Sequence, residues 1–164
     1  MKRGTQTVSA AEYRRLAAEH SLGGRIPRRT AANNYIAVGR GFREIGGRQI
    51  YFRSRWEANV ARYYEWLKSR GELAAWAYEP REDEFWFPIR RGTRSYLPDF
   101  KLTSTDGTSV YVEVKGWRDP KSALKLRRMK RYHPHITVVV IGKAEYGRLA
   151  RQIAGIVPGW EVSA

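Results

Sequence analysis

Two carboxylates and a lysine stand at a spacing that suits metal-dependent hydrolysis. Asp99 follows a proline, and Glu113 and Lys115 lie two positions apart in a later segment of alternating polarity. Side chains two apart in a strand leave the same face of a sheet, so Glu113 and Lys115 share a face. Neighbouring carboxylates repel each other without a cation between them, and oxygen ligands suit Mg²⁺. The pattern predicts a site for a hard divalent cation.

The turn between the two segments decides whether Asp99 joins that face. A two-residue turn at Asp106-Gly107 would set Asp99 opposite Val114 and aim it at the other face. A three-residue loop over 105–107, with its glycine left-handed, sets Asp99 opposite Glu113 instead. In that register the two Cβ atoms stand ~4.5–5.5 Å apart, close enough for both carboxylates to hold one metal ion.

Phosphodiester hydrolysis is the chemistry that these residue types favour. A metal ion held by Asp99 and Glu113 would activate water and offset the charge that builds on phosphorus, and one or two ions could serve. Lys115 could orient or deprotonate the attacking water, or stabilise the pentacovalent state. The alternative is a solvated Glu-Lys ladder on an edge strand, with an aspartate near a turn.

Glu57 is a further acidic candidate with two interpretations. Ser54 and Glu57 match a capping box, so Glu57 could serve only to bond the start of a helix. At 100° per residue, however, Glu57 lies about 60° from Val60, on the rim of the apolar stripe that must face the sheet. A helix cap and a residue of the metal site both remain open.

The charge of the chain points to a polyanionic partner. The 164 residues include 31 Lys and Arg against 16 Asp and Glu, a formal net charge of +15. Clustered basic residues supply most of the non-specific affinity for nucleic acid. A basic loop and a helical stripe at i, i+4 and i+7 flank the acidic residues, although a solvated helix face is the plainer interpretation of the stripe. The expected DNA contacts are Arg90, Arg91, Arg94, Lys121, Lys125 and Arg128.

Composition excludes several other classes of protein. The chain has no cysteine, which excludes disulfides, thiolate metal sites and a cysteine nucleophile. Apolar residues make up 42% and aromatic residues 13%, too many for a disordered chain. No apolar run approaches the roughly 20 residues of a membrane span, and no signal-peptide core follows the first residues. We expect a soluble intracellular protein with no membrane partner.

The elements that must position these residues follow from hydrophobic periodicity. We expect helices over 54–69, 119–132 and 144–154, the second capped by Asp119. We expect strands over 74–79, 84–89, 96–103, 109–115 and 136–141, the last a β-branched run typical of a strand buried on both faces. The order αββββαβα predicts an α/β fold with a mixed β-sheet flanked by helices.

The first third of the chain differs from the rest in its basic charge and its many glycines. We expect residues 1–50 to form a basic N-terminal arm with one short helix over 9–20. We expect residues 51–164 to form the nuclease domain. The glycines at 39, 41, 46 and 47 favour a loop rather than a core element. The arm is either a solvated basic tail or a segment that folds on DNA or on a second subunit.

Five motifs in order resemble a known nuclease superfamily. They are Ser54-x-x-Glu57, Tyr78-Glu79, Tyr96-x-Pro98-Asp99-Phe100, Val112-Glu113-x-Lys115-Gly116-Trp117 and the basic helix that follows. Over about residues 51–142 this pattern is similar to the PD-(D/E)XK nucleases, and within them to the phage endonuclease I type of Holliday-junction resolvase. The insert over 90–95, which is rich in arginine, departs from that pattern and puts substrate preference in doubt.

The resemblance implies a fold, a site and a substrate. It implies a restriction-endonuclease-like core and a Mg²⁺-dependent endodeoxyribonuclease that cuts branched DNA such as a four-way junction, with Mn²⁺ expected to substitute. The implied catalytic residues are Glu57, Asp99, Glu113 and Lys115. Asp99 and Glu113 would bind the metal ion, and Glu57 is a further expected metal ligand.

The resemblance also implies an assembly and a location. Because a junction needs paired nicks, two identical active sites in a homodimer are expected, and a phage enzyme would act in the cytoplasm of an infected bacterial host. Two alternatives remain: a nuclease of the same fold that acts on ordinary duplex, flaps or DNA ends, and a non-catalytic basic DNA-binding protein.

Overall fold

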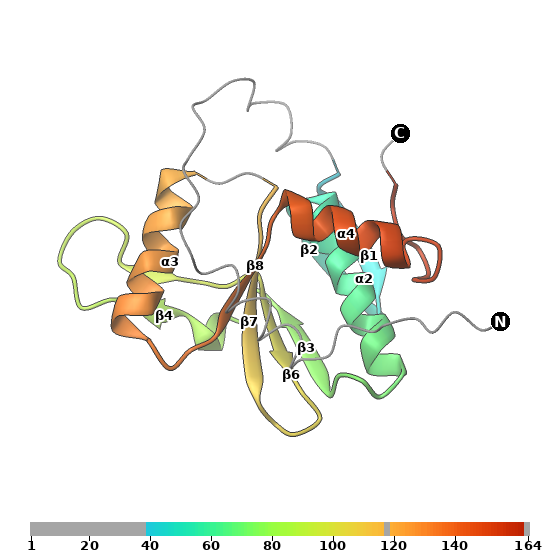
Figure 1. The fold of residues 1–164 in the computed structure, drawn as a ribbon, viewed down its shortest axis with the longest axis horizontal. Helices are drawn as coiled ribbons and strands as arrows, with labels where there is room; N and C mark the ends of the chain where they lie inside the picture. Colours follow the sequence, from blue (N-terminus) through green and yellow to red (C-terminus); the bar gives the residue numbers. More distant parts are fainter. Residues whose placement is uncertain (1–38, 117–118, 163–164) are drawn as a thin grey trace.

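A mixed sheet organises the fold. The structure is a computed structural model that describes residues 39–116 and 119–162. Within these ranges the main sheet has the strand order β3 (Ala75–Tyr78), β6 (Phe100–Thr103), β7 (Ser109–Val114) and β8 (Val138–Ile141). The first three strands are antiparallel neighbours, and β8 runs parallel to β7. Helices flank this sheet (Figure 1), which confirms the predicted mixed α/β architecture.

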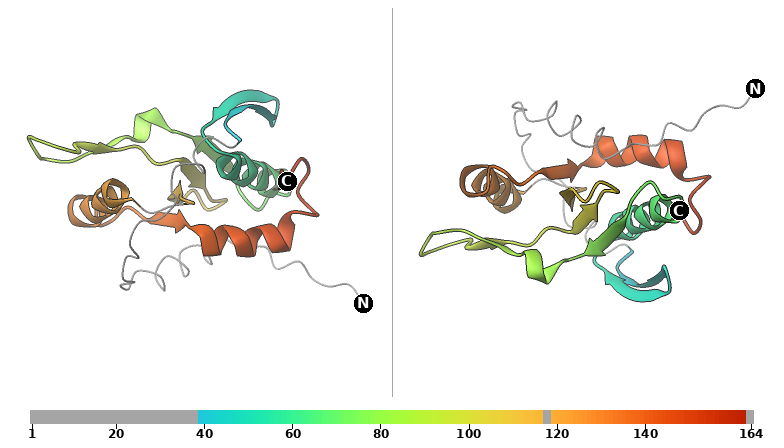
Figure 2. Two further views of the ribbon diagram at one scale, coloured as in Figure 1. Left: turned by 90° about the horizontal axis from the view of Figure 1, so that it is seen from above. Right: turned by 90° about the horizontal axis from the view of Figure 1, so that it is seen from below.

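Two helices cover one face of the sheet. The helices α2 (Arg55–Ser69) and α4 (Lys143–Ile153) lie on the same side of the strands (Figure 2). Because cross-strand partners share a face, Phe100, Val112 and Val139 point toward these helices and form one buried cluster with them. The amphipathic stripe predicted for the first of these helices is therefore confirmed as its core face.

The opposite face is covered by a shorter hairpin and by the basic helix. The strand β4 (Phe85–Trp86) pairs with β5 (Ser95–Tyr96), and α3 (Pro120–Tyr132) packs beside them. A second buried cluster of Phe87, Tyr96 and Met129 joins the three elements. In Figure 1 this group projects on the far side of the sheet from α2 and α4.

The predicted strands over 84–89 and 96–103 were wrong in extent. Only four residues of the shorter hairpin pair with each other, and they form no ladder with the main sheet. The second predicted strand divides into β5 and β6 around Pro98, which lacks the N–H that a continuous ladder requires. This interruption leaves Asp99 at the start of β6.

A β-hairpin occupies the segment over 39–50 that was predicted to be a loop. The strands β1 (Gly41–Ile45) and β2 (Arg48–Phe52) pair in register across a two-residue turn. Gly46 and Gly47 have φ values of 58° and 72°, the left-handed pair that a type I′ turn requires. Ile45 of β1 and Phe52 of β2 enter the main core, so the expectation of a loop at these glycines was wrong. Residues 1–38, with the predicted short helix, lie outside the described residues.

The remaining elements follow the sequence more closely. Ser54 caps α2 and Asp119 caps α3, each side chain accepting a hydrogen bond from a backbone N–H three residues on. The strand β8 lies at the edge of the described sheet with alternating burial, so the prediction of burial on both faces was wrong. None of the helices in the described ranges is long and apolar enough to cross a membrane.

Candidate active site

The acidic residues meet where β3 ends, β6 begins and β7 ends. The hairpin between β6 and β7 sets their relative position: Phe100 lies opposite Val112 and Thr103 opposite Ser109. The N–H of Gly107 donates to the carbonyl of Ser104 at 2.9 Å, and Gly107 has a φ of 82°. The N–H of Ser104 donates to the carbonyl of Thr108 at 2.9 Å, so the three-residue loop over 105–107 is confirmed. Asp99 immediately precedes β6, and the same register continued by one position places it opposite Glu113.

Asp99 and Glu113 form a buried carboxylate pair. Their exposed fractions are 4% and 7%, and Oδ2 of Asp99 accepts a hydrogen bond of 2.8 Å from the N–H of Val114. Burial raises the pKa of Asp99 to about 8, with repulsion from Glu113 and Glu57 adding to the effect. The N–H of Val114 and the guanidinium of Arg53 lower that pKa but are outweighed. The pair therefore favours either a proton or a cation.

Lys115 lies beside the carboxylate pair, as the strand alternation predicts. Its Nζ is 3.5 Å from Oε1 of Glu113 and 3.9 Å from Oδ2 of Asp119, the residue that caps α3. The hydroxyl of Tyr96 donates to Oε2 of Glu113 at 3.1 Å, and burial raises the pKa of that phenol well above its usual value. Glu113 is thus held by a hydroxyl on one oxygen and an ammonium near the other.

Glu57 lies in the first turn of α2, which Ser54 caps, and contributes negative charge to the site. Its N–H donates to Oγ of Ser54 at 3.2 Å, and its carboxylate accepts from the N–H of Arg53 at 3.1 Å and from the hydroxyl of Tyr78 at 2.5 Å. Burial raises the pKa of Tyr78 above its usual value, and the charge of Glu57 adds to this effect. Glu57 also raises the pKa of Asp99. The Ser54 cap is confirmed, but the Glu57 carboxylate accepts from the N–H of Arg53 and the hydroxyl of Ser54, and not from the N–H of Ser54 as a capping box requires.

Arg53 is a site residue that the sequence did not reveal. Its guanidinium Nη2 lies 2.7 Å from Oδ1 of Asp99 and 3.1 Å from Oε1 of Glu79, and its Nε lies 4.0 Å from Glu57. Burial disfavours the charge of this guanidinium, yet attraction from Asp99 and Glu57 outweighs burial and holds its pKa above the usual value. Arg53 immediately precedes the capping serine, but its approach to Asp99 depends on the hairpin that the sequence analysis missed.

The donor set fits a hard cation only in part. Asp99 and Glu113 supply the adjacent buried oxygens that Mg²⁺ prefers, and the N–H of Val114 and the hydroxyl of Tyr96 orient them from outside. Across the ranges that the structure describes, no group of three or more His, Cys, Asp or Glu side chains is arranged to hold a metal ion. Glu57 is engaged by three donors, and the cation that contacts Asp99 is the guanidinium of Arg53.

The predicted DNA-contacting residues gather on one side of the site. We refer to the β4–β5 hairpin together with α3 as the basic lobe. Arg90, Arg91 and Arg94 are exposed in the connection between β4 and β5, and Arg128 of α3 donates to the carbonyl of Thr93 in that same connection. Lys121 is exposed on α3, and Lys125 and Arg128 are half-buried. The loop and the helix therefore form one continuous basic structure instead of two separate surfaces.

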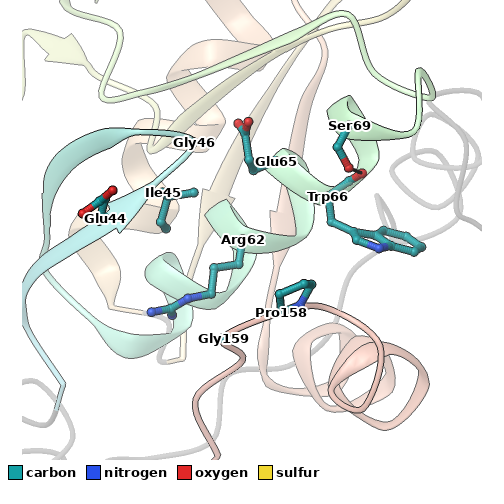
Figure 3. Close-up of a pocket in the computed structure, with 9 residues that line it drawn as sticks. All are labelled: Glu44, Ile45, Gly46, Arg62, Glu65, Trp66, Ser69, Pro158 and Gly159. Carbon is teal, nitrogen blue, oxygen red and sulfur yellow. Dashed lines mark hydrogen bonds between the residues drawn. The ribbon is translucent and has the colours of Figure 1, made fainter.

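A cavity of about 430 Å³ lies away from the acidic residues. Figure 3 shows it between the β1–β2 turn, α2 and the segment near Gly159. Its polar side chains are already paired: Glu65 accepts from the indole N–H of Trp76 at 2.7 Å, and Arg62 contacts Glu161 at 2.8 Å. The cavity contains none of the predicted site residues and its charges serve the packing of these elements.

No protein-family model matches the chain, and no curated protein matches its sequence. The resemblance to PD-(D/E)XK nucleases therefore depends on the five sequence motifs alone.

Proposed function

We propose that the protein is a metal-dependent endodeoxyribonuclease with a restriction-endonuclease-like core that hydrolyses phosphodiesters in branched DNA, as a Holliday-junction resolvase does. One observation carries the proposal: Asp99 and Glu113 form a buried pair at the ends of adjacent strands, and Lys115 lies on the same face. A carboxylate pair buried beside a lysine is costly for stability alone, because two neighbouring negative charges repel in a desolvated site.

The roles of the side chains follow from their positions. Asp99 and Glu113 would hold Mg²⁺ or Mn²⁺, which supplies an activated water and offsets the charge of the reacting phosphate. Lys115 is half-buried and within reach of Glu113, so its ammonium can orient the water or stabilise the oxygens on phosphorus. Glu57, held by Ser54 and Tyr78, would fix the position of the first turn of α2 beside Asp99 and add negative charge that favours the cation.

The basic lobe supports DNA as the substrate. The hydroxyl of Tyr96 in this lobe donates to Glu113, and Asp119, which caps α3, lies 3.9 Å from Lys115. The lobe therefore contacts the site directly. Phosphates bound along α3 and the β4–β5 connection would therefore lead a DNA strand past the carboxylates. Paired nicks in a four-way junction would come from two copies of the chain in a homodimer.

A non-catalytic DNA-binding protein is the second candidate, and one contact favours it. The guanidinium of Arg53 lies at 2.7 Å from Asp99, so the acidic cluster has a cationic partner within the chain itself. In that case the carboxylates would be a structural ion-pair network and no metal would be needed. A nuclease that acts on duplex, flaps or DNA ends would share the site and differ only in substrate.

Cleavage of a labelled four-way junction beside its matching duplex tests these candidates. We expect paired symmetric nicks in the junction with Mg²⁺, none with EDTA, and a loss of at least about a hundredfold in rate for Asp99→Asn. Asp106→Asn, the same change in the loop at the opposite end of the β6–β7 hairpin, should retain activity. Equal cutting of both DNAs would replace the resolvase with a general nuclease, and tight binding without cutting would leave the non-catalytic protein.

A further inference from the structure

Arg53 is the side chain whose position the proposed chemistry does not explain. It follows directly after β2, and its guanidinium contacts Asp99 at 2.7 Å and Glu79 at 3.1 Å. A divalent cation bound by Asp99 would lie near this guanidinium, and two cations at that separation repel each other. The contact seen here and the proposed metal ion therefore compete for Asp99.

The backbone around Arg53 is fixed while its side chain is accessible. Its N–H donates to the buried carboxylate of Glu57 at 3.1 Å, and the preceding Phe52 is fully buried against Tyr78. The Arg53 side chain, in contrast, is 59% exposed. A guanidinium on a fixed backbone with an exposed side chain can change partners by rotamer changes alone, without movement of the sheet.

A second network holds the hairpin that delivers Arg53. Nε of Arg43 in β1 lies 2.6 Å from Oε1 of Glu161, and Arg62 of α2 contacts the same carboxylate at 2.8 Å. Asn59 of α2 bonds both the N–H and the carbonyl of Glu161, at 2.8 and 2.7 Å. The hairpin is thus tied to α2 through the segment that ends near Glu161.

We propose that Arg53 is the resident counter-cation of the metal-free site, that a divalent ion displaces it from Asp99, and that the released guanidinium then binds a phosphate of the DNA. The inference rests on the proposed function. It assigns Arg53 two partners in sequence: a carboxylate before the metal binds and a phosphate afterwards. Guanidinium matches both partners, since it donates bidentate hydrogen bonds to carboxylates and phosphates alike.

Displacement of Arg53 also couples the two ligands. In the absence of metal the guanidinium is held by carboxylates and is withheld from DNA. When Asp99 is occupied by a metal ion, Arg53 loses its shortest contact and is repelled by the ion, while its longer contacts with Glu79 at 3.1 Å and Glu57 at 4.0 Å keep the 59% exposed side chain near the site. Metal binding would therefore raise the affinity for DNA in two ways: it neutralises the carboxylates, and it makes Arg53 available to a phosphate. By linkage, DNA would raise the affinity for the metal ion by the same factor.

Metal titration of the folded protein without DNA tests whether the metal ion displaces Arg53 from Asp99. Calorimetry with Mg²⁺ and with Ca²⁺ at pH 9 would compare the wild type with Arg53→Met, Arg53→Lys and Arg40→Met. Arg40 is exposed near the start of β1, so its replacement removes the same charge from the same region without touching the carboxylates. We expect Arg53→Met to bind metal about fivefold more tightly, the factor of a partly exposed ion pair, and Arg40→Met to match the wild type.

Binding of a four-way junction with and without Ca²⁺ tests whether the released Arg53 then binds DNA. A denaturing gel verifies that the DNA stays uncut. Without metal, Arg53→Met should bind the junction as the wild type does; with Ca²⁺ it should bind about fivefold more weakly, and Arg53→Lys should recover part of the difference. If Arg53→Met binds metal no more tightly than the wild type, the metal ion does not displace Arg53 from Asp99. If Arg53→Met loses the same DNA affinity with and without Ca²⁺, metal binding does not release Arg53 to the DNA. A wild type that binds neither metal overturns the proposed function itself.

Discussion

Burial makes the charged form of Asp99 unfavourable in the candidate site. Asp99 is buried beside Glu113, and burial raises its pKa to about 8 from an ordinary value of 3.8. Because the folded protein holds this proton more tightly than the unfolded chain does, protonated Asp99 stabilises the fold. That contribution is fully present below the ordinary pKa and is lost as the pH rises through about 8.

Thermal unfolding in EDTA from pH 4 to pH 9 should reveal this dependence. We expect the melting temperature of the wild type to fall as the pH rises, and the fall to be smaller in Asp99→Asn, because the amide stays neutral throughout. The difference between the two curves is the relevant quantity, since the other titrating groups are common to both. Parallel curves would contradict a raised pKa for Asp99.

At this scale the sequence located the acidic residues but not their basic partner. Asp99, Glu113 and Lys115 could be placed because strand alternation and a glycine at 107 fix their faces and register. Arg53 could not be placed, since its contact with Asp99 joins residues 46 positions apart and depends on where a separate hairpin lies. Local periodicity carries no information on such a contact.

The starts of α2 and α3 were predictable because each helix has a side-chain cap. Ser54 and Asp119 begin their helices where the sequence places them, and the buried residues of α2 follow the helical period. The β1–β2 hairpin was missed although Gly46-Gly47 between two short polar-apolar runs is a signal for a type I′ turn. Its strands carry two arginines, Arg43 and Arg48, and an exposed aromatic pair, Phe42 and Tyr51, so the polar-apolar alternation was hard to recognise.

Asn59 determines how the elements around the hairpin are joined. Its fully buried amide donates to the hydroxyl of Tyr146 at 2.8 Å and bonds both backbone groups of Glu161. Asn59→Ala would leave those partly buried backbone groups of Glu161 without their present partner and empty a fully buried position, so we expect a loss of about 2–4 kcal/mol in the free energy of unfolding. Urea unfolding measures the loss, with Ser69→Ala at the exposed end of α2 as a control that changes little. A loss below about 1 kcal/mol would mean that water satisfies these groups.

The whole molecule combines a strongly basic charge with an acidic site. The net charge of +15 repels metal cations at long range, while the local carboxylates attract them. A bound polyanion reverses the long-range term, so DNA and metal should each favour the binding of the other. The net charge also makes DNA affinity strongly dependent on salt, and the slope of that dependence counts the phosphates that the protein neutralises.

The side of the molecule that binds DNA can be identified from that slope. Replacing Arg90, Arg91 and Arg94 by alanine removes three exposed charges from the basic lobe. If all three contact phosphates, the slope of log K against log salt should become shallower by about 2 to 3 units. A triple replacement of Lys143, Arg148 and Arg151 removes the same charge from α4, on the opposite face of the sheet, and should leave the slope nearly unchanged. Equal changes in both variants would mean that DNA follows the net charge of the molecule instead of the lobe that is fastened to Glu113 and Lys115.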